Sequence, residues 1–130
     1  MSVTFAQGFS AAGVAAGISA VEGKKDMALV VNNGPLDAAA AVFTTNRFCA
    51  APVQWSRKVV ADGHVKAVIL NSRGANACTG KPGYEQSQAT AEKVAELLGA
   101  FANDVAVCST GLIGEPRQRT GFAVPFLLPE

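Results

Sequence analysis

The chain has 130 residues, of which 49% are hydrophobic and 16% charged, and its formal net charge at pH 7 is +1. This length accommodates one domain with a hydrophobic core, while the near-neutral charge and the absence of long Lys or Arg runs exclude a strongly basic surface for nucleic acid or an anionic membrane. Because no apolar stretch approaches the roughly 20 residues of a membrane span, and the N-terminus lacks the basic region of a signal peptide, we expect a cytoplasmic protein.

The first third of the chain predicts an opening β-hairpin. The Gly- and Ala-rich stretch 8–19 suits a loop or an irregular pair of strands. Residues 26–33 predict a strand ended by an Asn-Gly-Pro turn, and residues 38–46 predict a second strand, since Val, Phe and two Thr outweigh the preceding alanines. Two apolar segments joined by a short polar turn are typical of a hairpin.

A helix and a strand are expected next. Pro52 can open a short helix within the stretch 51–63, and Gly63 is well placed to follow it. The stretch 65–72 is short, rich in β-branched residues and bounded by a polar turn, so it predicts a strand.

The second half predicts a βαβ unit. A loop rich in small residues, 73–83, precedes an amphipathic helix over 84–101, and a strand follows at 104–110. Gly99 is expected to help end the helix. Its buried face is predicted to carry Ala91, Val94, Ala95 and Leu98.

The cysteines and the histidine give little support for a metal site or a catalytic pair. The three cysteines, at 49, 78 and 108, are an odd number without a Cys-x-x-Cys pair, and we expect them to be mostly buried thiols. The single histidine, His64, lies at a turn before a strand and is expected on the surface without a catalytic partner.

The loop after the strand 65–72 has two interpretations. Its Asn and Gly residues tolerate positive φ angles and can turn N–H groups toward a ligand, as in the wall of an active site. Alternatively it is a tight strand-to-helix connection whose side chains bond their own backbone, which composition alone favours. Its small and polar residues are Asn71, Ser72, Gly74, Asn76, Thr79 and Gly80.

A Ser-Thr-Gly sequence follows the last predicted strand. The hydroxyl of Thr110 and an unshielded N–H at Gly111 could stabilise the oxyanion of an acyl transfer, or a hydroxyl there could cap a helix. No Gly-x-Ser-x-Gly elbow is present, and the only histidine is far away in sequence. Either the chain is not an enzyme, or the nucleophile lies outside it.

Five stretches together resemble the N-terminal part of the ornithine acetyltransferases, or glutamate N-acetyltransferases, of arginine biosynthesis. They occur in the family order and cover about residues 5 to 116, with "AVFTTN", "GANACTG" and "CSTGLIG" as the most specific sequences. One departure is Arg73, where the family usually has Gly or another small residue. The five stretches are 8–19, 26–35, 38–57, 65–80 and 107–115.

The resemblance implies an acyltransferase that moves acetyl from N-acetyl-L-ornithine to L-glutamate, with acetyl-CoA as donor in some members and no bound cofactor. The family precursor cleaves itself into α and β chains, which form an α/β heterotetramer, and the N-terminal threonine of the β chain is the nucleophile. Thr110 and Gly111 match the family's oxyanion hole. The cleavage motif and the substrate-binding residues lie beyond residue 130 in the family.

The resemblance also implies a fold and a domain division. The fold would be a mixed α/β sandwich of α-β-β-α type, of which this chain holds an incomplete N-terminal part. Residues 1–116 correspond to the α-chain part, and 117–130 are a divergent tail with no family match, as expected for a truncated or frameshifted reading frame. An incomplete sheet exposes an edge and an apolar face, which predicts poor solubility.

Three functional interpretations follow. The chain is a fragment of an ornithine acetyltransferase that is inactive alone, a non-catalytic half that complements a separately encoded β chain, or part of a related self-processing aminopeptidase-type hydrolase. The close match of the loops at 71–80 and 109–114 favours the acetyltransferase.

Overall fold

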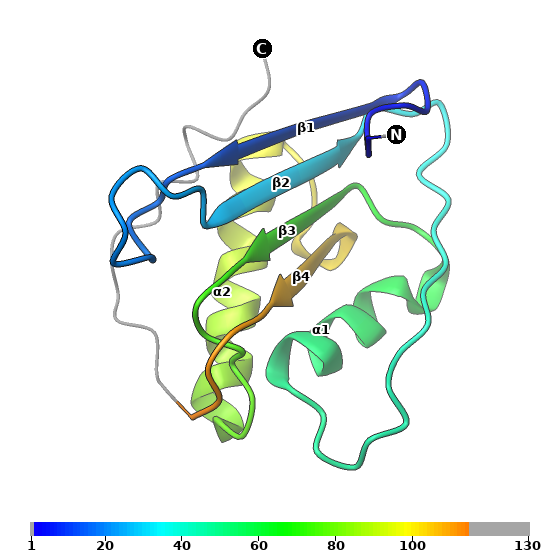
Figure 1. Ribbon diagram of the computed structural model, residues 1–130. Helices are drawn as coiled ribbons and strands as arrows, with labels where there is room; N and C mark the ends of the chain where they lie inside the picture. Colours follow the sequence, from blue (N-terminus) through cyan, green and yellow to red (C-terminus); the bar gives the residue numbers. More distant parts are fainter. Residues whose placement is uncertain (1, 115–130) are drawn as a thin grey trace.

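Four strands form one mixed sheet in the computed structural model, which describes residues 2–114 (Figure 1). The strand order is β1-β2-β3-β4, with antiparallel pairing from β1 to β3 and parallel pairing of β3 with β4. The strands are β1 (Phe9–Val14), β2 (Met27–Asn32), β3 (Ala67–Asn71) and β4 (Val105–Ser109).

Two helices accompany the sheet. The long helix α2 (Gly80–Leu98) connects the parallel strands β3 and β4 and packs behind the sheet, which confirms the predicted βαβ unit (Figure 1). The shorter helix α1 (Ala51–Val59) lies beside β4, with Pro52 in its first turn. Short 3-10 turns, η1 (Val60–Asp62) and η2 (Ala102–Asp104), follow the two helices. No helix among residues 2–114 is long and apolar enough to cross a membrane.

The core lies between one face of the sheet and the two helices. Alternate residues of β2 and β3, such as Leu29 and Ile69, point toward the helices and are almost completely buried. The predicted apolar face of α2 meets them, with Ala91 and Val94 fully buried. The mixed α/β fold class is therefore confirmed.

Helix α1 covers the free edge of β4 with side-chain hydrogen bonds. The Trp55 Nε1–H donates to the carbonyl oxygen of Val105 at 2.9 Å. The Ser56 hydroxyl donates to the carbonyl oxygen of Val107 at 2.8 Å and accepts the N–H of the same residue at 2.9 Å. Helix α1 thus occupies the position of a fifth strand, and β4 does not present an open ladder.

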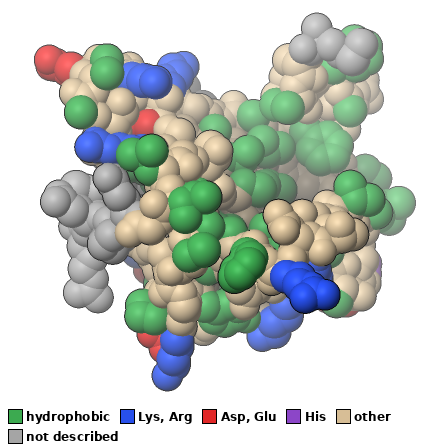
Figure 2. Space-filling model, turned by 60° about the horizontal axis from the view of Figure 1, so that its bottom comes forward, with side chains coloured by type: hydrophobic (Ala, Val, Ile, Leu, Met, Phe, Trp, Pro, Cys, Tyr) green, Lys and Arg blue, Asp and Glu red, His purple; other side chains and the backbone are tan. Residues whose placement is uncertain are grey.

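The opposite face of the sheet has no helix over it within residues 2–114. Its side chains are largely apolar, and they include Leu70, which is 37% exposed, and Phe9, which is 40% exposed. Figure 2 shows hydrophobic side chains gathered around a hollowed region of this side of the molecule. This arrangement matches the expected incomplete sandwich, in which only one sheet lies within the described chain.

The predicted hairpin of 26–33 with 38–46 is wrong. Residues 38–46 form no strand, and only Ala38 makes an isolated bridge, to His64. Strand β2 already pairs with β1 on one side and β3 on the other, so no edge of β2 is left for this segment. Instead Arg57 holds it against α1, since the guanidinium donates to the Thr44 carbonyl at 3.2 Å and lies 5.3 Å from the Phe43 ring centre.

Two further boundaries differ from the sequence prediction. Residues 9–14, expected as a loop or irregular strand pair, form the regular strand β1. Helix α2 begins at Gly80, four residues earlier than predicted, because Pro82 and Gly83 are accommodated in its first turn. Its end agrees with the prediction, since Gly99 adopts a φ of 63° and donates its N–H to the Ala95 carbonyl.

The cysteine prediction is wrong in part. All three thiols are free, but Cys49 is only half-buried and Cys78 and Cys108 are exposed. Cys108 alternates onto the face of the sheet that no helix covers within residues 2–114, and it is therefore only partly buried. The predicted division at residue 116 and the tail 117–130 lie outside the residues that the structure describes.

Candidate active site

Three chain segments meet at one end of the sheet. The loop 72–79 follows β3 and the turn 110–114 follows β4, and because these strands are parallel, both segments leave from the same edge. The connection 15–26 reaches this edge as well, since Met27 at the start of β2 pairs with Asn71 at the end of β3. This end of the sheet therefore gathers the residues that the sequence marked as candidates.

Backbone hydrogen bonds attach the turn 110–114 to the loop after β3. The Thr110 N–H donates to the Asn71 carbonyl at 3.1 Å, and the Leu112 N–H donates to the Arg73 carbonyl at 2.8 Å. In return the Leu112 carbonyl accepts the Ala75 N–H at 2.9 Å. The parallel pairing of β3 and β4 thus continues past the ends of both strands, which holds the turn in a defined place.

Gly111 cannot be replaced by a larger residue without disturbing this attachment. Its φ is +133°, a conformation that side chains rarely adopt. A Cβ atom built at this position would collide with the backbone carbonyl group of Arg73. The structure therefore gives a steric reason for the glycine in the Ser-Thr-Gly sequence.

Two hydrogen-bond donors remain available at the turn. Thr110 and Gly111 are both exposed. The Thr110 N–H is used by Asn71, but within residues 2–114 no hydrogen bond engages the Thr110 hydroxyl or the Gly111 N–H. A hydroxyl and an N–H on adjacent residues can both donate to one oxygen atom.

Part of the loop 72–79 is a tight strand-to-helix connection whose side chains bond to nearby groups of the same loop and of α2. This agrees with the second of the two interpretations drawn from the sequence. Asn76, in a left-handed conformation with φ 50°, donates its Nδ2 to the Gly83 carbonyl at 2.9 Å and to the Ser87 hydroxyl at 3.1 Å. Its Oδ1 accepts the Thr79 hydroxyl at 2.7 Å. These side chains secure the start of α2 and are not free to bind a ligand.

Arg73 adopts a backbone conformation that suits a glycine. Its φ is 84°, a left-handed conformation that favours glycine. Its guanidinium Nη1 donates to the Ile18 carbonyl at 2.7 Å. This bond ties the loop after β3 to the connection 15–26.

Asp26 is a buried residue of this region that the sequence analysis did not identify. Its carboxylate accepts the Ala16 N–H at 2.7 Å and the Ser19 N–H at 2.6 Å. Burial by itself would raise the pKa of Asp26, but backbone donors, with Ser19 and Ala16 the strongest, prevail and lower it below the usual value. Its carbonyl also accepts the Ser72 N–H at 2.9 Å. In the sequence, the signal that could have identified Asp26 was its place directly before the apolar run that forms β2.

The other candidate groups lie elsewhere. His64 is exposed, precedes β3 at the far end of the sheet, and donates its backbone N–H to Asp62. No group of His, Cys, Asp and Glu within residues 2–114 could hold a metal ion. Burial of part of its surface raises the pKa of the Cys108 thiol, which disfavours a thiolate nucleophile there.

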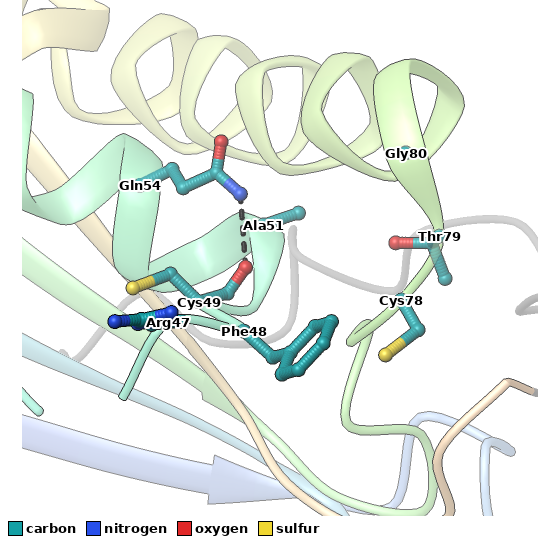
Figure 3. Close-up of a pocket in the computed structure, with 8 residues that line it drawn as sticks. All are labelled: Arg47, Phe48, Cys49, Ala51, Gln54, Cys78, Thr79 and Gly80. Atoms are coloured by element: carbon teal, nitrogen blue, oxygen red, sulfur yellow. Dashed lines mark hydrogen bonds between the residues drawn. The ribbon is translucent and has the colours of Figure 1, made fainter. Parts of the chain in front are cut away.

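A cavity of about 350 Å³ opens between the first turns of the two helices (Figure 3). Gln54 closes one side of it and donates to the Cys49 carbonyl at 2.9 Å. Neither Thr110 nor Gly111 lines this cavity, so it is separate from the turn after β4. The lining residues are Arg47, Phe48, Cys49, Ala51, Gln54, Cys78, Thr79 and Gly80.

Comparison with known proteins identifies relatives over most of the described chain. The model of the ArgJ family matches residues 10–123. The arginine biosynthesis bifunctional protein ArgJ of Bifidobacterium longum is 88% identical over 115 residues, which are 88% of this chain and 29% of that protein. The protein of the same name from Streptomyces coelicolor is 61% identical over 114 residues, or 30% of its length.

Two solved structures have the same arrangement of elements. Ornithine acetyltransferase from Mycobacterium tuberculosis, complexed with ornithine, has a TM-score of 0.83 and 55% identity over 88% of this chain and 61% of that one. The ArgJ protein of Bacillus halodurans also has a TM-score of 0.83, at 38% identity over 92% of this chain and 61% of that one. The chain spans about 30% of the length of the curated relatives it matches, and it belongs to the ArgJ family.

Proposed function

We propose that this chain forms the oxyanion-binding part of an acetyltransferase that moves an acetyl group from N-acetyl-L-ornithine to L-glutamate. The observation that carries the proposal is a pair of donors, the Thr110 hydroxyl and the Gly111 N–H, that have no hydrogen-bond partner within residues 2–114 and lie on a turn that backbone bonds hold in place. Family membership supports the reaction, and so does the ornithine complexed with the related enzyme from M. tuberculosis.

In the proposed reaction a threonine hydroxyl from the remaining part of the family polypeptide adds to the acetyl carbonyl carbon. A C–O bond forms, and the carbonyl oxygen becomes an oxyanion that accepts hydrogen bonds from Thr110 and Gly111. Cleavage of the C–N bond then releases ornithine, whose amine takes up the proton lost by the hydroxyl. The amine of glutamate then attacks the acetyl carbon of the acetyl-threonine. A C–N bond forms, the C–O bond to threonine breaks, and the proton lost by the amine restores the threonine hydroxyl as N-acetylglutamate leaves.

This assignment makes the chain part of a larger assembly. The nucleophile would come from a β chain produced by self-cleavage in the longer family polypeptide, with an α/β heterotetramer as the complete cytoplasmic enzyme and acetyl-CoA as a further donor in some members. No step requires a bound cofactor. The isolated chain is expected to be inactive, because no nucleophile with a base accompanies the two donors within residues 2–114.

Acetyl transfer from N-acetyl-ornithine to glutamate tests the proposal. The isolated chain would be compared with a complete polypeptide in which residues 1–114 of this chain are joined to the remaining part of the B. longum relative, hereafter the fusion. Activity of the fusion alone is expected, and Thr110→Ala should lower its kcat about 100-fold, the usual effect of losing one oxyanion donor. Thr45→Ala, an exposed threonine outside the site, is the control. Activity of the isolated chain would refute the proposal.

A further inference from the structure

Asn71 differs from the other buried asparagines of the described chain. Its side chain is 4% exposed, yet neither Nδ2 nor Oδ1 has a hydrogen-bond partner among residues 2–114. Asn32, by contrast, donates to the Leu36 carbonyl at 3.0 Å and accepts the Gly34 N–H at 2.9 Å. Folded proteins nearly always supply partners to buried amides, so a group outside residues 2–114 is expected to bind this one.

The position of Asn71 links it to the oxyanion turn. It is the last residue of β3, and its backbone carbonyl accepts the Thr110 N–H at 3.1 Å. Its register partner on β4 is Ser109, directly before that turn. Along β3 its side chain lies on the helix-covered face with Ile69, so the amide lies at the end of the core where the backbone of Asn71 holds the turn.

The nearest polar side chains of the loop after β3 are already engaged. Asn76 and Thr79 bond to each other, and the Ser72 hydroxyl lies 3.4 Å from the Asp26 carbonyl, to which it donates. An asparagine amide offers both a donor and an acceptor, which matches one peptide group of a neighbouring backbone. Any segment that brings a nucleophile to Thr110 and Gly111 has to pack against this end of the sheet.

From these observations, and resting on the proposed function, we propose that Asn71 is a positioning residue for the nucleophile. Its side-chain amide binds a peptide group of the segment that carries the nucleophilic threonine, while its backbone carbonyl holds the turn that carries the oxyanion donors. One residue thereby sets the nucleophile and the donors relative to each other. In this enclosed site the amide hydrogen bonds are stronger than at a solvated surface.

The test uses the fusion with Asn71→Leu, an apolar replacement of similar size. Loss of the amide should lower kcat at least about 30-fold with KM for N-acetyl-ornithine changed less than about threefold, because orientation and not binding is lost. Amide hydrogen exchange should also become faster in the segment that begins at the nucleophile. The control Asn32→Leu removes a bonded asparagine at the opposite end of the sheet, so it should lower Tm and leave the kcat of the folded protein within about twofold.

Three results would overturn the inference. Asn71→Leu with unchanged kcat and a higher Tm would mean that the amide has no partner in the complete polypeptide. A lower kcat with unchanged amide hydrogen exchange in the nucleophile segment would mean that Asn71 acts only by holding the turn 110–114, and not by binding that segment. An unsubstituted fusion without acetyl transfer would overturn the proposed function and this inference together, whereas an active fusion isolates the result for Asn71.

Asn71→Asp keeps the test decisive if the leucine variant does not fold. The aspartate has the same shape but ionises, and its charge would oppose the developing oxyanion. The ratio of its kcat to that of the unsubstituted fusion should fall at least about tenfold as pH rises through the carboxyl pKa. A ratio that stays near one across this pH range would contradict a positioning role.

Discussion

Gly111 and Arg73 touch through their backbones, and this contact places the donors that we propose for the oxyanion. The glycine is needed for its positive φ and because the Arg73 carbonyl group occupies the space of a side chain. The backbone bonds on either side of the contact fix the direction of the Gly111 N–H. At the scale of single residues, the candidate site depends on the absence of a side chain as much as on the Thr110 hydroxyl.

Gly111→Ala should disrupt the turn after β4. We expect a loss of about 2 kcal/mol or more in the free energy of unfolding, from the positive φ and the collision with Arg73 together. Gly114→Ala is the matched control: its φ is +81° but no atom of residues 2–114 lies near the added Cβ, so about 1 kcal/mol is expected. Urea unfolding of the isolated chain at low concentration measures both, and equal losses would show that the close approach to Arg73 is unimportant.

Asp26 makes the stability of this region depend on pH. Because backbone donors lower its folded pKa below the unfolded value, its contribution is present above the unfolded pKa and is lost as pH falls through the folded pKa. We expect the urea midpoint to drop as the pH falls through and below the usual range of an aspartate carboxyl, and Asp26→Asn to be less stable at neutral pH but less sensitive to acid. Glu22→Gln changes an exposed carboxyl of the same connection and is the control.

Helix α1 has two roles at the scale of secondary-structure elements. It contributes Trp55 and Val59 to the core, and it covers the edge of β4 with bonds from Trp55 and Ser56. A strand edge closed in this way cannot pair with another chain. The expectation of an exposed edge therefore fails at β4. The expected uncovered face is found within residues 2–114, where no helix lies over that side of the sheet.

Ser56→Ala should expose the dependence of β4 on this helix. It leaves the buried N–H and carbonyl of Val107 without their partner, so we expect a loss of about 1–3 kcal/mol in the free energy of unfolding. Gln54→Ala removes an exposed side-chain bond from the same helix, and its cost should stay within about 0.5 kcal/mol. Chemical unfolding measures the free energy of unfolding of both variants. Similar losses would argue that the Ser56 hydrogen bonds to β4 do not stabilise its edge.

At the scale of the whole molecule, residues 2–114 cover only one face of the sheet. The helix-covered face holds the core, while the other face presents apolar side chains that include Leu70 and Phe9. In a longer ArgJ polypeptide this face and the end of the sheet near Thr110 are both available to the remaining part of the chain.

The uncovered face should make the isolated chain self-associate. Leu70→Lys places a charge in the middle of that face and is expected to lower the apparent mass seen by light scattering toward that of a monomer. Phe101→Lys changes a residue that is 80% exposed but lies outside the sheet, so association should persist. A monomeric unsubstituted chain with a sharp, cooperative melt would contradict this prediction.

The strands at 26–33, 65–72 and 104–110 and both helices could be predicted from sequence because their signals are local. Apolar periodicity, Pro52 and Gly99 act within a turn or two of the chain. The segment 38–46 was mispredicted for the opposite reason. Its β-branched and aromatic residues favour extended backbone, but a strand also needs a free edge, and the pairing of β1 and β3 with β2 leaves none there.

The sequence by itself determined the family resemblance, the βαβ unit and the candidates Thr110 and Gly111, because short motifs and periodicity carry that information. Only the tertiary structure decided which donors at the turn are free, that Arg73 excludes a side chain at residue 111, and that the amide of Asn71 is buried without a partner within residues 2–114. Each of these depends on atoms of β3 and β4 that are far apart in the chain and meet only when the parallel strands pair.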